Sequence, residues 1–152
     1  MAPAQASLMA KLDTQERVRD FLTNAVASGR ASHAYLFLGA PGAGKLDAAW
    51  ALAQAFLCEQ DGCGACDSCV RVARHTHPDV HYYTPESATG YLIAQTRELL
   101  DDVPLAPIRA KAKVYIIDRA EQLRANTANA LLKTLEEPPE ASCLSCWAPP
   151  PT

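Results

Sequence analysis

A glycine-rich run that ends in lysine is the first group of residues whose types and spacing could do chemistry. Residues 39–45 read Gly-Ala-Pro-Gly-Ala-Gly-Lys and match the first seven positions of the phosphate-loop pattern G-x-x-x-x-G-K-[ST]. Glycines let successive backbone N–H groups turn inward around an anion, and a helix N-terminus adds positive potential. Lys45 would reach the terminal phosphates of ATP or ADP. The alternative is a glycine-rich strand-to-helix turn that holds no ligand.

The position after Lys45 departs from the pattern. It holds Leu46, where the pattern has a Ser or Thr hydroxyl that coordinates Mg²⁺. Leucine cannot coordinate a metal, and Asp47 is expected to project from a different side of the helix. Phosphoryl transfer needs Mg²⁺ to bridge the β- and γ-oxygens and to neutralise developing charge. Leu46 therefore counts against Mg²⁺ coordination and against hydrolysis.

A second acidic position follows the apolar run at 114–117. Parallel sheets place ligands at the carboxyl ends of their strands, so Asp118 is expected beside the phosphate loop, as in a Walker B segment. Taken alone, Asp118 is better explained as a helix cap. The next residue is Arg119, where ATPases of this type have a glutamate that orients the attacking water. A guanidinium cannot act as a base near neutral pH, and Glu121 is expected to lie too far along the chain.

Two catalytic groups are therefore missing, the hydroxyl at 46 and the carboxylate at 119. The sequence predicts a nucleotide site that does not hydrolyse ATP, and a chain with no catalytic residue and no activity of its own. The predicted nucleotide-binding residues are Gly39, Ala40, Pro41, Gly42, Ala43, Gly44, Lys45, Leu46 and Asp118.

Four cysteines gather in one short segment with the spacing C-x4-C-x2-C-x2-C. They are Cys58, Cys63, Cys66 and Cys69. Four thiolates suit tetrahedral zinc, and because they leave no open coordination position the predicted role is structural. The alternatives are reduced structural cysteines, a disulfide pair or an iron–sulfur cluster. Three histidines are spare ligand candidates, and the C-x2-C pair near the C-terminus receives no function; these residues are His75, His77, His81, Cys143 and Cys146.

The elements that must position these residues follow from hydrophobic spacing. Apolar residues between Val18 and Val26 predict a first helix, with Asp13 and Glu16 as a capping pair and Gly29 at its end. Alternation of strands and helices predicts an α/β fold with a parallel sheet. The patterns predict strands at 34–38, 79–83 and 113–117, and helices at 45–57, 93–103 and 126–136.

The C-terminal residues break this alternation. A further core strand should follow the prolines at 138 and 139, but the segment 141–147 contains no β-branched residue and runs into a proline-rich end. Proline cannot pair within a central strand. We therefore expect a flexible N-terminus at 1–12, a partial nucleotide-binding domain at 13–140 with the cysteine module at 58–69, and an aberrant or disordered tail at 141–152.

Composition excludes some classes of protein. With a net charge of -3, the chain as a whole has no electrostatic attraction to nucleic acid. Any contact with DNA would come from a local patch or from partner subunits. The longest apolar stretch, near 48–57, is too short to span a membrane, and the first ten residues lack the features of a secretion signal. A cytoplasmic protein is expected, in which cysteines serve as thiols or metal ligands.

Several motifs together resemble the bacterial clamp-loader subunits γ/τ and δ′ of DNA polymerase III. One is the phosphate loop whose helix runs into the cysteine module, followed by His-Pro-Asp-Val at 77–80. The others are Ser-His-Ala-Tyr-Leu-Phe at 32–37 and Asn-Ala-Leu-Leu-Lys-Thr-Leu-Glu-Glu-Pro-Pro at 129–139. The resemblance extends from Val18 to about Glu140. Within this family, Leu46 and Arg119 depart from the γ/τ pattern and resemble δ′, the subunit that does not hydrolyse ATP.

The resemblance implies an AAA+ domain in a multi-subunit ring with γ/τ and δ, which places the sliding clamp on primed DNA. The Ser-Arg-Cys motif, the sensor 1 strand, the lid and the collar of the family are expected to be absent from this chain. Two other hypotheses remain. One is an active ATPase of γ/τ type, and the other is a zinc-containing interaction module with a vestigial nucleotide site.

Overall fold

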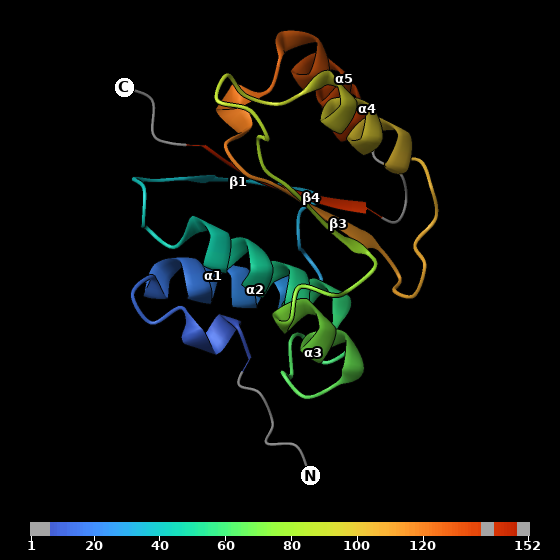
Figure 1. Cartoon of the computed structure of the whole chain (residues 1–152). Coiled ribbons are helices and arrows are strands. Elements are labelled where there is room, and N and C mark those ends of the chain that lie inside the picture. Colours follow the sequence, from blue (N-terminus) through green and yellow to red (C-terminus); the bar gives the residue numbers. More distant parts are fainter. Residues whose placement is uncertain (1–6, 138–141, 149–152) are drawn as a thin grey trace.

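The computed structural model describes residues 7–137 and the backbone of the strand at 142–148. A parallel sheet lies between two helical layers, with α1, α2 and α3 on one face and α4 and α5 on the other (Figure 1). The elements are η1 (Met9–Lys11), α1 (Glu16–Ala27), β1 (Ala34–Leu38), α2 (Lys45–Leu57), α3 (Asp67–Ala73), β2 (Val80–Tyr83), α4 (Ile93–Asp102), β3 (Lys113–Ile117), η2 (Ala120–Gln122), α5 (Ala125–Glu136) and β4 (Ser142–Ala148).

The predicted α/β class with a parallel sheet is confirmed. β1, α2 and β3 have the predicted bounds, and the other predicted elements are found with bounds that differ slightly. The predicted stop of α1 is also confirmed, because Gly29 has φ 68° and its N–H donates to the carbonyl of Val26. The predicted capping pair is wrong, since α1 begins at Glu16 and its N-cap residue, Gln15, makes no side-chain capping hydrogen bond.

The expectation for the C-terminal segment is wrong for Ser142–Ala148. The strand order is β1-β4-β3-β2, so β4 lies inside the sheet, parallel to both of its neighbours. The strand of the sheet that we expected to be absent is therefore present. Strand propensity is a weak guide here, because backbone hydrogen bonds to two neighbouring strands decide the conformation. The prolines that motivated the prediction follow Ala148, and residues 149–152 lie outside the described residues.

The N-terminal segment also differs from expectation. Residues 7–12 were predicted to be flexible, but Met9 and Leu12 are buried against α1 and α2. The backbone N–H of Leu8 donates to the side chain of Gln54. The apolar side chains of this segment thus extend the core formed by α1 and α2, and their burial favours an ordered conformation.

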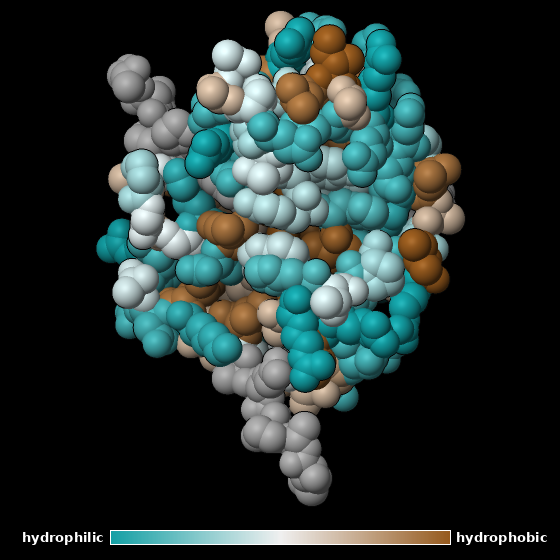
Figure 2. All heavy atoms as spheres, in the orientation of Figure 1, coloured by the Kyte–Doolittle hydropathy of each residue, from teal (hydrophilic) through white to brown (hydrophobic). Residues whose placement is uncertain are grey.

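Two cores lie on the two faces of the sheet. The five residues of β3 are all buried, with Val114 and Ile116 facing α2 and α3, and Tyr115 and Ile117 facing α4 and α5. The continuous burial of β3 is expected for a strand covered on both faces. The molecular face in Figure 2 is mostly hydrophilic, and its apolar areas are small and separated.

Gln54 is the polar residue among the buried residues of α2, the others being apolar. Its side chain is 1% exposed. The amide oxygen accepts the N–H of Leu8 at 2.8 Å, and the amide nitrogen donates to the carbonyl of Cys69 at 3.1 Å. Gln54 therefore joins the residue before η1 to α2 and α3, and satisfies a buried carbonyl and a partly buried N–H.

Replacing Gln54 by leucine is expected to lower the free energy of unfolding by about 2 kcal/mol, because a buried carbonyl and a partly buried N–H lose their partners. Urea denaturation followed by circular dichroism measures the change. The same substitution at the exposed Gln60 is the control and should alter stability little. Equal effects of Gln54→Leu and Gln60→Leu would contradict the bridging role.

Candidate functional site

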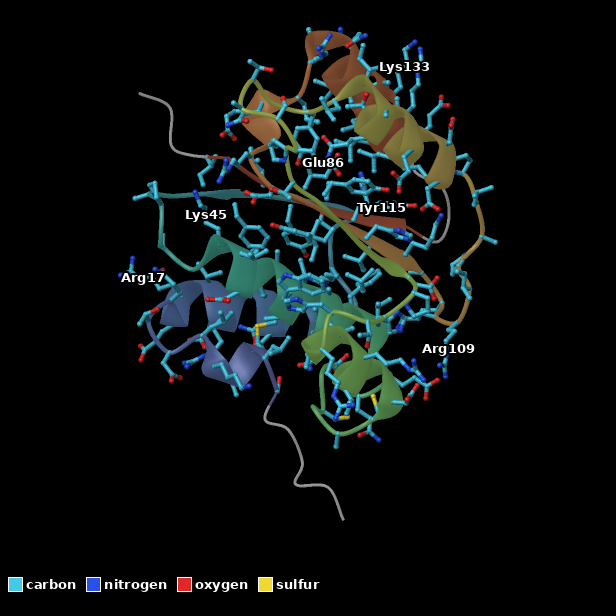
Figure 3. All side chains as sticks on the ribbon, viewed as in Figure 1. Arg17, Lys45, Glu86, Arg109, Tyr115 and Lys133 are labelled. Carbon is cyan, nitrogen blue, oxygen red and sulfur yellow. The ribbon has the colours of Figure 1, made fainter. Side chains whose placement is uncertain are left out.

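The glycine-rich segment connects the end of β1 to the start of α2. Gly42 and Gly44 have φ angles of 80° and 83°, and Gly44 precedes the helix in the left-handed region that glycine adopts without strain. Lys45 is the first helical residue, and its Nζ donates to the carbonyl of Gly39 at 2.5 Å. In Figure 3 Lys45 lies at the end of the sheet where β1 runs into α2.

The structure brings the glycine-rich loop with Lys45 and the acidic residue Asp118 to one cleft. The cleft has a volume of about 660 Å³ and is lined by residues of the glycine-rich loop, the start of α2 and the segment after β3. Gly39, Ala40 and Ala43 belong to the loop but do not line the cleft. The lining residues are Pro41, Gly42, Gly44, Lys45, Leu46, Asp47, Asp118, Arg119, Glu121 and Gln122.

The charges around the cleft differ from the sequence-based expectation. Asp47 and Glu121 were expected to lie away from it, but both line it. The short helix η2 turns the chain back after Arg119, which itself has a φ of 52° in the left-handed region. The ammonium and guanidinium of Lys45 and Arg119 therefore share the cleft with three carboxylates. The side chain of Leu46 has no oxygen that could coordinate a metal ion, and it packs in part against the core between α2 and β3.

Asp118 is held by residues that the sequence reasoning did not identify. The hydroxyls of Tyr82 and Thr84 both donate to Asp118 Oδ2, each at 3.2 Å. Burial, and then the negative charge of Asp118, raises the pKa of Tyr82, so its phenol stays protonated and remains a donor. The sequence could have indicated these residues. Tyr82 lies near the end of β2 and Thr84 directly follows it, and because β2 is parallel to β3 both lie at the same edge of the sheet as Asp118.

The four predicted zinc ligands converge. Their Sγ atoms all lie within 4.8 Å of one another. The Cys58 sulfur is 3.7 Å from that of Cys63 and 3.8 Å from that of Cys66, and Cys63 is 4.0 Å from Cys69. Four sulfurs about 2.3 Å from one ion at the corners of a tetrahedron lie about 3.8 Å apart. Because a disulfide needs about 2.05 Å, this spacing fits a metal ion and excludes a bonded pair.

Backbone N–H groups surround the sulfurs, as they do in sites that stabilise thiolates. Gln60 and Cys63 donate to the Cys58 sulfur at 3.3 and 3.5 Å. Burial raises the pKa of the Cys58 thiol, but these backbone donors outweigh it and lower the pKa to about 6. Burial raises the pKa of Cys66 and Cys69 instead. A cation would supply the charge that deprotonates these two thiols.

The cysteine module is partly helical, which the sequence analysis missed. Cys69 lies on α3, and Cys66 caps the start of that helix by accepting the N–H of Cys69. Gly62 allows the module to lie close to α2, since a Cβ there would lie 3.2 Å from Ala55 Cα. Across the module, Arg109 pairs with Asp67 at 3.0 Å, and Figure 3 shows Arg109 beside α3.

None of the histidines joins the metal cluster among the described residues. His75 stacks on the Trp50 ring at 3.9 Å between centroids. His77 accepts the N–H of Asp79 through Nδ1, and His81 lies 3.4 Å from a carboxylate oxygen of Asp102. Each histidine therefore has a structural contact of its own. The side chains of Cys143 and Cys146 lie outside the described residues.

Among the described helices, none has both the length and the apolar character needed to cross a bilayer.

Comparison with known proteins places the chain in a family. The family described as "DNA polymerase III, delta subunit" matches residues 14–146. The chain is 42% identical over 129 residues to DNA polymerase III subunit delta' of Bacillus subtilis, a match that covers 83% of this chain and 39% of that protein. It is 43% identical over 130 residues to DNA polymerase III subunit tau of Escherichia coli, covering 83% of this chain and 20% of that protein.

A solved structure supports the same fold. The chain is similar to a DNA polymerase III gamma subunit-related protein of Thermotoga maritima, with a TM-score of 0.55 and 19% identity over 86% of this chain and 38% of that one. The chain thus spans well under half the length of these relatives. Because the family match covers most of its residues, the chain belongs to the DNA polymerase III subunit family that includes delta' and gamma/tau.

Proposed function

We propose that this chain is a δ′-like component of the DNA polymerase III clamp loader that binds a nucleotide without hydrolysing it. Sequence identity does not separate the two subunit types, since the delta' and tau relatives match equally well. The chemistry of the cleft supports the choice. Arg119 lines it at the position where a general base would orient water, and Leu46 lines it without a hydroxyl. Neither side chain can perform the step that breaks the terminal anhydride.

The cleft is proposed as the site for ATP or ADP within a P-loop AAA+ domain. The backbone N–H groups of the segment 39–45 and the N-terminus of α2 would surround the phosphates, and Lys45 would exchange its contact with Gly39 for one with phosphate oxygen. Mg²⁺, when present, would neutralise phosphate charge. Asp118 would hold it directly or through water, because Leu46 offers no ligand.

Zinc is the proposed metal of the cysteine module, and its role is structural. The proposed partners are the γ/τ and δ subunits of the loader and, through them, the sliding clamp and primed DNA. These partners rest on family membership, since the chain spans only part of its relatives.

Lys45→Ala is expected to weaken ADP binding by about tenfold or more, because a cation next to the phosphates is lost. Isothermal titration calorimetry measures it. Lys133→Ala changes an exposed lysine of α5, which Figure 3 shows well away from Lys45, and this variant should bind ADP normally. The unaltered chain should release no phosphate from ATP above background. Phosphate release that Asp118→Asn abolishes would overturn the non-hydrolysing role.

An active ATPase of γ/τ type is the second candidate. It is favoured by Glu121, which lines the cleft and supplies a carboxylate that could orient water. In that case Glu121→Gln would abolish phosphate release while ADP binding stayed intact. Failure of the chain to bind any adenine nucleotide would instead support the third hypothesis, an interaction module with a vestigial site.

A further inference from the structure

Tyr82 of β2 and Thr84, the residue after this strand, place two hydroxyl groups beside Asp118 of the nucleotide cleft. The ladder between β2 and β3 pairs Tyr83 with Ile117, so Thr84 and Asp118 follow at the same level on adjacent strands. The hydroxyls of Tyr82 and Thr84 reach Asp118 from this position, at 3.2 Å each. Both of these hydrogen bonds fall on Oδ2. Oδ1 is then the carboxylate oxygen that remains for a ligand in the cleft.

The main chain at this point is fixed independently of the two hydroxyls. The N–H of Asp118 donates to the carbonyl of Tyr83 at 2.8 Å. The hydroxyl of Tyr91 lies 2.9 Å from the carbonyl oxygen of Tyr83 and 2.5 Å from that of Asp118. Loss of the hydroxyl of Tyr82 or Thr84 would therefore free the Asp118 side chain to rotate and leave its backbone in place.

A simpler explanation is that the hydroxyls only satisfy a half-buried carboxylate. Two observations argue for more. Tyr82 is 41% exposed, so water could solvate its hydroxyl without this contact. Its ring is nevertheless held against Trp50 of α2, at 6.1 Å between centroids, which directs the hydroxyl across the strand ends toward Asp118. A restrained aromatic donor fixes geometry at a lower entropy cost than a flexible side chain.

We propose that Tyr82 and Thr84 are positioning residues of the nucleotide cleft, which hold one oxygen of Asp118 so that the other faces the divalent cation that accompanies a nucleotide. This inference rests on the proposed function. With Leu46 unable to coordinate, Asp118 has to contribute more to cation binding than its counterpart in a site with a Ser or Thr ligand. Its orientation then determines how much Mg²⁺ strengthens nucleotide binding.

The test measures ADP affinity by isothermal titration calorimetry with Mg²⁺ and in buffer without added Mg²⁺. Chelators are avoided because they would remove zinc from the cysteine module. The proteins are the unaltered chain, Tyr82→Phe, Thr84→Val and the double variant. Each change removes a hydroxyl and keeps the shape of the side chain, and the single variants carry the test if the double variant unfolds.

The unaltered chain is expected to bind ADP about fivefold more tightly with Mg²⁺, and the double variant to lose most of this preference, as two hydrogen bonds to a charged group are lost. Affinity without Mg²⁺ should change less than about twofold. Tyr83→Phe is the matched control, since its ring lies in the core on the other face of the sheet.

The outcomes separate this inference from the proposed function. If the double variant keeps the full Mg²⁺ preference, or if the unaltered chain has none, the positioning role is overturned and nucleotide binding stands. If the unaltered chain binds no ADP in either buffer, the proposed nucleotide site is overturned together with the inference.

Discussion

Serine in place of Cys69 is expected to release the metal ion and to lower the free energy of unfolding by about 3 kcal/mol or more. A structural zinc site contributes its binding free energy to folding, which in small zinc domains amounts to roughly 10 kcal/mol or more. Cys69 is fully buried and its sulfur completes the cluster from helix α3. A serine hydroxyl is a poor zinc ligand, so the three remaining thiols would hold the ion weakly.

Metal analysis and thermal denaturation check this result. The unaltered chain should contain about one zinc per molecule and show no absorption band near about 400 nm, where iron–sulfur clusters absorb. Ser68→Ala on the same helix is the control and should keep its zinc. A Cys69→Ser protein with unchanged zinc content, or an unaltered chain that purifies with iron, would refute the assignment.

The consequences of metal loss should extend beyond the cysteine module. Gln54 of α2 donates a hydrogen bond to the carbonyl of Cys69. His75, which follows α3, stacks on Trp50, which also lies on α2. α2 begins at Lys45 in the phosphate loop. The module therefore packs against the helix that presents the proposed phosphate site, so loss of the proposed zinc ion would be transmitted to the cleft through α2.

Asp79→Asn is expected to lower the free energy of unfolding by about 3 kcal/mol, because a buried carboxylate that accepts three backbone N–H groups loses its charge and an acceptor oxygen. Asp79 is fully buried. Its oxygens accept the N–H groups of residues 108, 109 and 110 at 2.6, 2.7 and 2.7 Å. The loop that leads into β3 is thereby fixed to the start of β2. Chemical denaturation measures the loss, and Asp101→Asn at an exposed position is the control.

The effect of Asp79→Asn should depend on pH in a defined direction. Burial raises the pKa of Asp79, but the three backbone donors outweigh it and hold the pKa below the ordinary value of 3.8. A carboxylate with a lowered folded pKa contributes stability above its unfolded pKa and loses it as pH falls through the folded pKa. The difference between the unaltered chain and the variant should thus shrink as the pH falls below 3.8. A difference that grows below this pH would contradict the assignment.

Much of the fold could be predicted from sequence because its signals are local. β1, α2 and β3 were predicted with their observed bounds, since a continuous apolar run next to glycine or a charged residue marks both ends of an element. The C-terminal strand was missed for the opposite reason. Its residues have weak strand propensity, and only the space between β1 and β3, with hydrogen-bonding groups on both sides, makes them a strand. Helix α3 was missed because cysteine spacing alone suggested a loop.

The sequence by itself determined which chemistry this chain can offer: a glycine-rich loop with Lys45, an acidic residue after a buried strand, four thiols at zinc spacing, and the absence of a hydroxyl at 46. Ligand type is a property of residue identity, and spacing within one turn or loop limits geometry. Tertiary structure decided which distant groups meet. The contacts of Asp118 with Tyr82 and Thr84, of Asp79 with the loop before β3, and the presence of Glu121 in the cleft all join residues through strand register and loop direction. These depend on packing of the whole sheet, which no local pattern encodes.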